Sequence, residues 1–282
     1  MEIQLGEQRI FALDERLPFD EIRQRAMDRR TQAFGSGLGS LLQRPRAEDI
    51  TLVAWQRRLD PFWHVSCQAR YVYERSREYA VPASAPEVKE VTIGDATYPV
   101  QASGRGALFT VPVREHCREE FWHEIFADGA TGAPVPDAAS VITGPSTPIT
   151  DPDSLGAEGT IVVPPEHRAS FVVRKLLAEM LKAVQADTMT EELLTLEKTD
   201  LYYRPVWAFE FHWTPRDRRG VVEIDALTGL TRQGQSLLPA GLKKMMSRDM
   251  LFDIGADTAG LIIPGGSIAV KVAKAALDKR SS

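Results

Sequence analysis

Two segments of this chain match each other without a gap, and this match constrains the fold more than any other feature of the sequence. Residues 50–63 align with residues 194–207, and both segments run on into a stretch of alternating polar and apolar side chains that is typical of a strand. The identical positions include Pro61 with Pro205 and Trp63 with Trp207. Such self-similarity predicts that one structural unit occurs twice in the chain.

A second pair of matching sequences follows the two segments in the same order. Asp128-Gly-Ala-Thr-Gly132 comes after the first segment and Asp225-Ala-Leu-Thr-Gly229 after the second. An aspartate at the start of a turn accepts hydrogen bonds from N–H groups two or three residues later, and the closing glycine supplies a positive φ. We therefore predict a duplicated unit. Its structural positions are Pro61, Trp63, Asp128 and Gly132 in the first copy and Pro205, Trp207, Asp225 and Gly229 in the second.

This pattern divides the chain into four parts. Residues 1–133 are expected to form a first helix-plus-sheet unit with extra strands, and residues 134–165, rich in proline, a linker. Residues 166–236 are expected to form the second unit, because apolar residues recur at helical spacing from Ser170 to Ala186 before further strands. Residues 237–282 read as a helical tail. The predicted fold class is α+β: two diverged copies of an antiparallel sheet covered by a helix, plus a C-terminal helical tail.

The second copy resembles a known family of domains. Its strand enters through Pro205-x-Trp207, and residues 220–229 read Gly-Val-Val-Glu-Ile-Asp-Ala-Leu-Thr-Gly, which is similar to the closing strand and turn of PepSY domains. Residues 124–132 of the first copy resemble that pattern less closely. PepSY domains place one helix across a small antiparallel sheet. The resemblance implies a non-catalytic binding or regulatory module.

Charge and hydropathy limit the kinds of partner and the cellular location that can be expected for this chain. The net charge is −5 and positive residues are interspersed with negative ones, so no nucleic-acid partner is expected. The first 30 residues lack the apolar segment of a secretory signal, and the two cysteines suggest no disulfide framework, so a cytoplasmic location is expected. The longest uncharged stretch, residues 258–270, is shorter than the roughly 20 apolar residues that span a bilayer.

Four residues of the first unit are the candidates for metal chemistry. They are His64, Cys67, His116 and His123. Zinc accepts histidine and cysteine ligands in tetrahedral sets. However, a strand points His64 and Cys67 to opposite faces, because side chains alternate with a period of two. The alternative interpretation is an ordinary buried cysteine with half-buried histidines. No cofactor is therefore expected, and a zinc protein or an enzyme that uses these residues is the rival hypothesis.

The C-terminal tail is the candidate contact surface. Residues 268–279 form a wide apolar arc on a helical wheel, with Ser267 placed to cap the helix. The apolar positions expected to bind a partner are Leu261, Ile262, Ile263, Ile268, Val272 and Ala276. Such a face packs on its own domain, on another protein or a second copy, or on a lipid surface. The sequence thus favours a non-enzymatic protein-interaction or assembly module, with a peripheral membrane protein as an alternative.

Overall fold

The computed structural model describes residues 1–35, 45–85, 87–103, 106–234, 236–238, 247–254 and 271–274. The α-helices are α1 (Phe19–Asp28), α2 (Ala138–Val141), α3 (Ala169–Met180) and α4 (Arg248–Leu251). Short 3-10 helices are η1 (Arg30–Phe34), η3 (Ala47–Asp49), η4 (Pro152–Gly159) and η5 (Thr214–Arg216). The strands are β1 (Glu2–Leu13), β2 (Ile50–Pro82), β3 (Glu90–Ile93), β4 (Ala96–Pro99), β5 (Gln101–Ser103), β6 (Gly106–Asp128), β7 (Ser146–Pro148), β8 (Ile161–Val162), β9 (Thr188–Trp213), β10 (Arg218–Asp225), β11 (Thr231–Gly234) and β12 (Lys271–Lys274).

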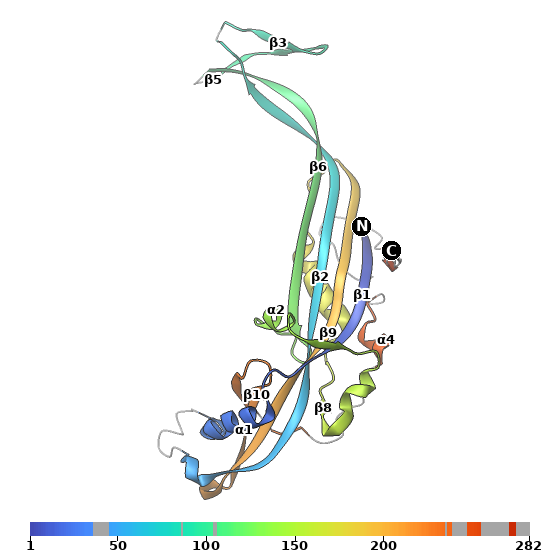
Figure 1. Ribbon diagram of the computed structural model, residues 1–282. Coiled ribbons are helices and arrows are strands. Elements are labelled where there is room, and N and C mark those ends of the chain that lie inside the picture. Colours follow the sequence, from blue (N-terminus) through green and yellow to red (C-terminus); the bar gives the residue numbers. More distant parts are fainter. Residues whose placement is uncertain are drawn as a thin grey trace.

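One large mixed sheet dominates the molecule. Its central strands lie in the order β11-β10-β9-β2-β6-β5, and β1 pairs with β9 in parallel. Figure 1 shows β2, β6 and β9 running along most of the length of an elongated body. Strands make up 53% of the structure and helices 20%. The predicted α+β class is therefore wrong: this is a mainly β protein with a few helices on its sheet.

The two matching segments do not form separate sheets. They belong to β2 and β9, which pair with each other as antiparallel neighbours along most of their length. The helices are also exchanged, since α1 contacts β9 and β10 whereas α3 contacts β2 and β6. Two separate small sheets would each have a bare backbone edge, and pairing β2 with β9 satisfies both edges at once. The expectation of two independent units fails for this reason.

The register gives the sequence match a geometric meaning. Asp60 and Arg204 occupy the same position in the aligned segments, and they face each other across the two strands. On either side of this pair, Leu59 faces Pro205 and Pro61 faces Tyr203. An approximate two-fold axis therefore passes between Asp60 and Arg204, and it relates the first half of the sheet to the second.

The hydrophobic core lies between the sheet and α3. Alternate residues of β2 from Trp63 to Tyr73 are buried on that face, as period-two patterning requires. In α3, the predicted apolar stripe of Val173, Leu177 and Met180 is buried against them. The helix ends at Met180 rather than at Ala186, because Leu181 already has an extended backbone. A smaller core packs α1 and η1 on the far ends of β9 and β10.

The segment expected to be a linker holds several elements in the structure. It contains α2, β7, η4 and β8, and Ala138 and Val141 of α2 are buried. β7 pairs with β1, and β8 pairs with β2 in parallel at Leu59. These contacts place residues 134–163 against the sheet, where they form one side of the pocket described below.

The predicted C-terminal helical tail is wrong where the structure can be described. Residues 271–274 form β12, which pairs in parallel with β1 and places Val272 opposite Ile3. The edge of β1 there is open to a further strand, and β-branched residues such as Val272 favour extended backbone. Leu261, Ile262, Ile263, Ile268 and Ala276 lie outside the described residues.

Candidate functional site

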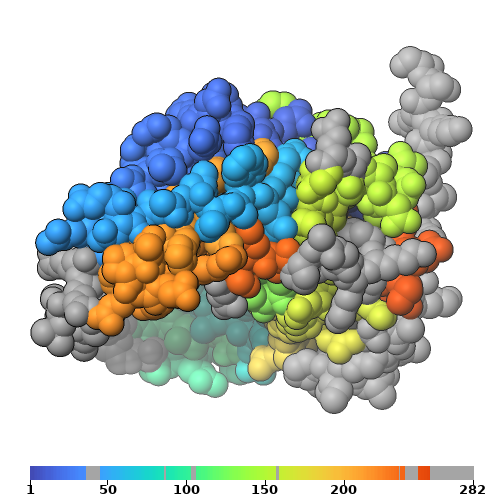
Figure 2. Space-filling model, turned by 90° about the horizontal axis from the view of Figure 1, so that it is seen from below, coloured from blue at the N-terminus to red at the C-terminus, as the bar shows by residue number. Residues whose placement is uncertain are grey.

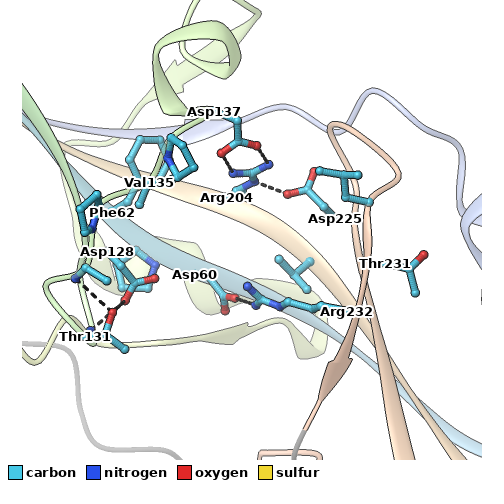
Figure 3. Close-up of a pocket in the computed structure, with 16 residues that line it drawn as sticks. Asp60, Phe62, Asp128, Thr131, Val135, Asp137, Arg204, Asp225, Thr231 and Arg232 are labelled. Carbon is cyan, nitrogen blue, oxygen red and sulfur yellow. Dashed lines mark hydrogen bonds and ion pairs between the residues drawn. The ribbon is translucent and has the colours of Figure 1, made fainter. Parts of the chain in front are cut away.

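A pocket of about 450 Å³ lies where the two halves of the sheet meet. It surrounds the approximate two-fold axis, between the two Asp-x-x-Thr-Gly turns (Figure 3). Most of the lining residues belong to one of two kinds: charged residues, or apolar residues with little side-chain flexibility. Those used below are Asp60, Asp128, Asp137, Arg204, Asp225 and Arg232.

The two turns are built as the sequence predicts, with closely similar geometry. Asp128 Oδ1 accepts hydrogen bonds from the N–H groups of Ala130 and Thr131 at 3.0 and 2.8 Å. Asp225 Oδ1 accepts the corresponding bonds in the second turn, both at 2.8 Å. The closing glycines, Gly132 and Gly229, have φ of 70° and 72°. These left-handed values are strained for residues with a side chain, which explains glycine at both positions.

Each turn is also hydrogen-bonded to the carbonyl of a proline in the neighbouring strand. The N–H of Gly129 donates to the carbonyl of Pro61 at 2.8 Å, and the N–H of Ala226 donates to that of Pro205 at 3.0 Å. The structure thus brings each predicted proline beside the aspartate of its own copy. Their repeated occurrence reflects a shared way of attaching a turn to a strand, and this is a structural role.

Arg204 lies at the centre of the pocket with two carboxylates. Its guanidinium donates to both oxygens of Asp137, at 3.0 and 2.6 Å, and its Nε forms an ion pair with Asp225 (Figure 3). The hydrogen bonds from Arg204 lower the pKa of Asp137 below its usual range. The contact joins β9 to α2 and to the end of β10. It therefore attaches residues 134–165, the segment predicted to be a linker, to the sheet.

Four further charges form a closed ring beside Arg204. Arg58 donates to both oxygens of Asp60, at 2.6 and 3.0 Å, and to Glu223 at 3.0 Å. Arg232 completes the ring, with Glu223 at 2.6 Å and Asp60 at 2.8 Å. Burial raises the pKa of Glu223, but the two arginines outweigh it and hold that pKa below its ordinary value. A carboxylate such as Glu223, which two arginines hold in its ionised form, suits structural clamping better than proton transfer.

Figure 2 shows the end of the molecule beyond this pocket. Residues of α1 (blue), of the start of β2 (light blue) and of the orange strands β9 and β10 lie side by side there. Phe19 of α1 packs between Trp207 and Trp55, with ring centroids 4.5 and 6.2 Å away. Trp55 is 53% exposed at this surface.

The four candidate metal ligands do not come together. Cys67 and His123 face each other across β2 and β6, on the α3 face of the sheet. His64 lies on the opposite face, and His116 pairs with Glu74 farther along the same strands. Burial raises the pKa of the Cys67 thiol to about 12, which disfavours the thiolate that binds metal. Among the residues that the structure describes, no group of three or more His, Cys, Asp or Glu is placed to hold a metal ion.

His64 is nonetheless an unusual residue. It is 1% exposed, its Nε2 lies 2.7 Å from Oε2 of Glu124, and its ring stacks on Phe126 at 4.4 Å. Burial is the main cause of its lowered pKa, although Glu124 opposes that effect. The folded protein therefore binds a proton at His64 less readily than the unfolded chain does.

This difference predicts a loss of stability in mild acid. As the pH falls below about 6.5, His64 becomes protonated in the unfolded chain but not in the folded protein. The free energy of unfolding therefore falls by up to about 1.4 kcal/mol per pH unit. We expect His64→Gln to lose less stability than the wild type between pH 7.5 and pH 5, measured by urea unfolding at both values. His116→Gln, at a position that is 74% exposed, is the matched control. Equal losses in all three proteins would rule out His64 as the source.

A projecting arm is the second candidate site. We define the arm as residues 76–82 of β2 and 108–114 of β6, with β3, β4 and β5 at its tip. β9 stops at Thr188, opposite Glu74, so that the arm continues as a two-stranded ribbon (Figure 1). Its tip is held by Phe109, which is 5% exposed and packs near Tyr98 at 6.3 Å. Tyr79 and Ile93, by contrast, are each 49% exposed.

Comparison of this chain with protein-family models, with curated proteins and with solved structures gave no match. The resemblance to PepSY domains therefore rests on the residues quoted above alone. None of the described helices has the length and apolar character that crossing a membrane requires.

Proposed function

We propose that this chain is a non-enzymatic protein-interaction or assembly module, and that the arm is its main contact element. The observation that carries the proposal is the extension of β2 and β6 beyond the strand that flanks them. An isolated two-stranded ribbon is only marginally stable in water, because it has no sheet or helix to cover its faces. Such a ribbon exposes apolar side chains that the described part of the fold does not bury, and these are available for contact with a partner.

The side chains of the arm support this proposal. Near its base, Arg75 and Tyr79 both donate to the carboxylate of Glu115, which fixes the ribbon's geometry where it leaves the sheet. The ring of Tyr79 and, at the tip, the side chain of Ile93 offer exposed apolar surface. Aromatic anchors on a pre-ordered element bind partners at low entropic cost. The charged pocket is less suited to this role, because its arginines are already paired within the chain.

Shortening the arm is the test. Arg77 and Val113 are cross-strand partners, so replacing residues 78–112 with Asn-Gly closes the ribbon with a two-residue turn. The α3 core lies elsewhere, so we expect the free energy of unfolding of the shortened chain, measured with urea, to stay within about 1 kcal/mol of that of the full chain. We expect it to lose a partner that the full chain retains in a pull-down from the native host.

Two comparison chains locate the contact. Trp55→Ser changes exposed apolar surface at the end opposite the arm and is expected to retain the partner. A chain ending at Gly255 removes the tail that the sequence favoured. Retention by the arm-shortened chain, together with loss on tail truncation, would place the contact on the tail and contradict the arm's role. Any partner found is then purified, and its Kd for the full and shortened chains is measured.

A further inference from the structure

One backbone edge of the large sheet is open over a long stretch. Figure 1 shows β6 as the outermost of the long strands on its side. β5 pairs with it only up to Leu108, and residues 133–135 bond to it only at Phe126 and Asp128. Within the described ranges, no strand pairs with this edge between those points. Open edges of this kind are templates for pairing with another strand.

The groups that face outward can be identified. The carbonyl of Phe126 accepts from Val135 and the N–H of Asp128 donates to Ala133, so both residues point their backbone groups away from β2. The β2–β6 register runs without a break, so the direction alternates and every even-numbered residue back to Leu108 also faces outward. Pro112 is one of them, and it has no N–H to offer. The usable edge therefore runs from Arg114 to Glu124.

We infer that two copies of this chain associate by antiparallel pairing of β6 with β6, about a two-fold axis at Glu119. This register follows from the ends of the usable edge, because Glu119 is its midpoint. It places Pro112 opposite Phe126 of the second copy, so that the two positions unable to continue the ladder coincide. All outward N–H and C=O groups between them then find partners.

The side chains agree with the same register. On one face, Arg118 lies opposite Glu120 of the second copy and Arg114 lies opposite Glu124, each pair occurring twice by symmetry. On the other face, Glu115 lies opposite His123. Opposite charges directly across an antiparallel pair stabilise it, whereas like charges destabilise it. At the axis, Glu119 meets its own copy, and the ion pair with Lys182 offsets its charge.

The charges also oppose other registers. Backbone hydrogen bonding allows the second copy to slide only in steps of two residues, since a single step would turn the bonding groups away. One such step brings Arg118 opposite Arg118, and a step the other way brings Glu120 opposite Glu120. An interface with identical strands therefore specifies one alignment.

This inference goes beyond the proposed function and does not depend on it, because the interface includes no more of the arm than Arg114 at its base. The axis is perpendicular to the sheet, so the two arms of the dimer project from opposite ends. The partner of the arm would then meet a molecule with two binding elements. The arm-shortened chain, which retains Val113 and all later residues, is expected to remain dimeric.

A disulfide tests the register. In Cys117→Ser, the further change Glu119→Cys places two thiols at a pair whose Cα atoms lie about 4.5 Å apart, within disulfide range. We expect mild oxidation to link most of the protein into covalent dimers. Val113→Cys in the same background is the control, since the two copies of residue 113 lie at opposite ends of the interface. Equal linking of both variants, or of neither, would overturn the inference.

Charge reversal tests the association itself. We expect sedimentation equilibrium to give the mass of two chains for the wild type and at least a tenfold weaker dimer for Arg118→Glu. Arg77→Glu reverses an exposed charge on the arm and is expected to leave the dimer unchanged. A wild type that stays monomeric at 100 µM, on the order of concentrations at which weak dimers form, would contradict the proposal.

Discussion

Replacing Arg204 with methionine is expected to lower the free energy of unfolding by about 3–5 kcal/mol. The side chain of Arg204 is 13% exposed, and it neutralises Asp137 and Asp225 together. Methionine has a similar length but leaves both carboxylates without their cation, one of them only 13% exposed. Urea unfolding followed by tryptophan fluorescence measures the loss.

Three comparisons separate the clamp from a general effect of losing a charge. Arg204→Lys keeps the charge but not the forked geometry, so we expect an intermediate loss. Arg219→Met removes an arginine that is 67% exposed and paired with Glu210, where less than about 1 kcal/mol is expected. In an Asp137→Asn background, Arg204→Met is expected to cost less than in the wild type, since one of the two carboxylates that Arg204 neutralises is already gone. If Arg204→Met costs no more than Arg219→Met, the clamp contributes nothing measurable.

Local features of this fold could be predicted from the sequence because they depend on near neighbours. The apolar stripe of α3 follows from helical spacing, and its buried residues are those that the spacing selects. Gly94 and Asp95 form the turn that joins β3 to β4, and Gly94 supplies the positive φ, 61°, that glycine adopts readily. The Asp-x-x-Thr-Gly turns form because an aspartate, a few N–H groups and a glycine suffice. None of these features requires knowledge of which strands are neighbours.

The global arrangement could not be predicted in the same way. A repeat in the sequence states that two segments are alike, but not that they pair with each other or exchange their helices. That pairing created the pocket and, beside it, the contact between Arg58 and Glu223, which lie 165 residues apart in the sequence. One sequence feature did point to it. The aligned position shared by Asp60 and Arg204 holds opposite charges, which fits two segments that face each other better than two segments in separate sheets.

The metal hypothesis shows the limit of reasoning about one strand at a time. Alternation correctly separated His64 from Cys67, but it could not show that His123 lies opposite Cys67. The arm was equally hidden. Its sequence continues the strand-like pattern of β2, and only the end of β9 at Thr188 reveals where the sheet stops and the ribbon begins.

Trp63 and Trp207 provide the second large prediction, because they are equivalent in sequence but not in burial. Trp63 is 0% exposed, donates from Nε1 to the carbonyl of His167 at 2.8 Å, and packs edge-on against Phe252 at 5.5 Å. Trp63→Ala removes a fully buried ring and leaves the carbonyl of His167 without that donor. We expect a loss of about 3–5 kcal/mol in unfolding free energy.

Trp207→Ala is the matched comparison and is expected to cost only about 1–2 kcal/mol. Trp207 is partly exposed, its Nε1 lies 3.4 Å from Oε2 of Glu15, and its ring rests on Phe19. The surrounding helices differ: α3 and the segment containing Phe252 close over Trp63, whereas the shorter apolar stripe of α1 leaves Trp207 in contact with solvent. Equal losses for the two alanine variants would mean that the approximate symmetry extends to the energetics and that burial does not decide the cost. A larger loss at Trp63 would show that the two halves share one backbone plan, while only the tryptophan under α3 lies inside a closed core.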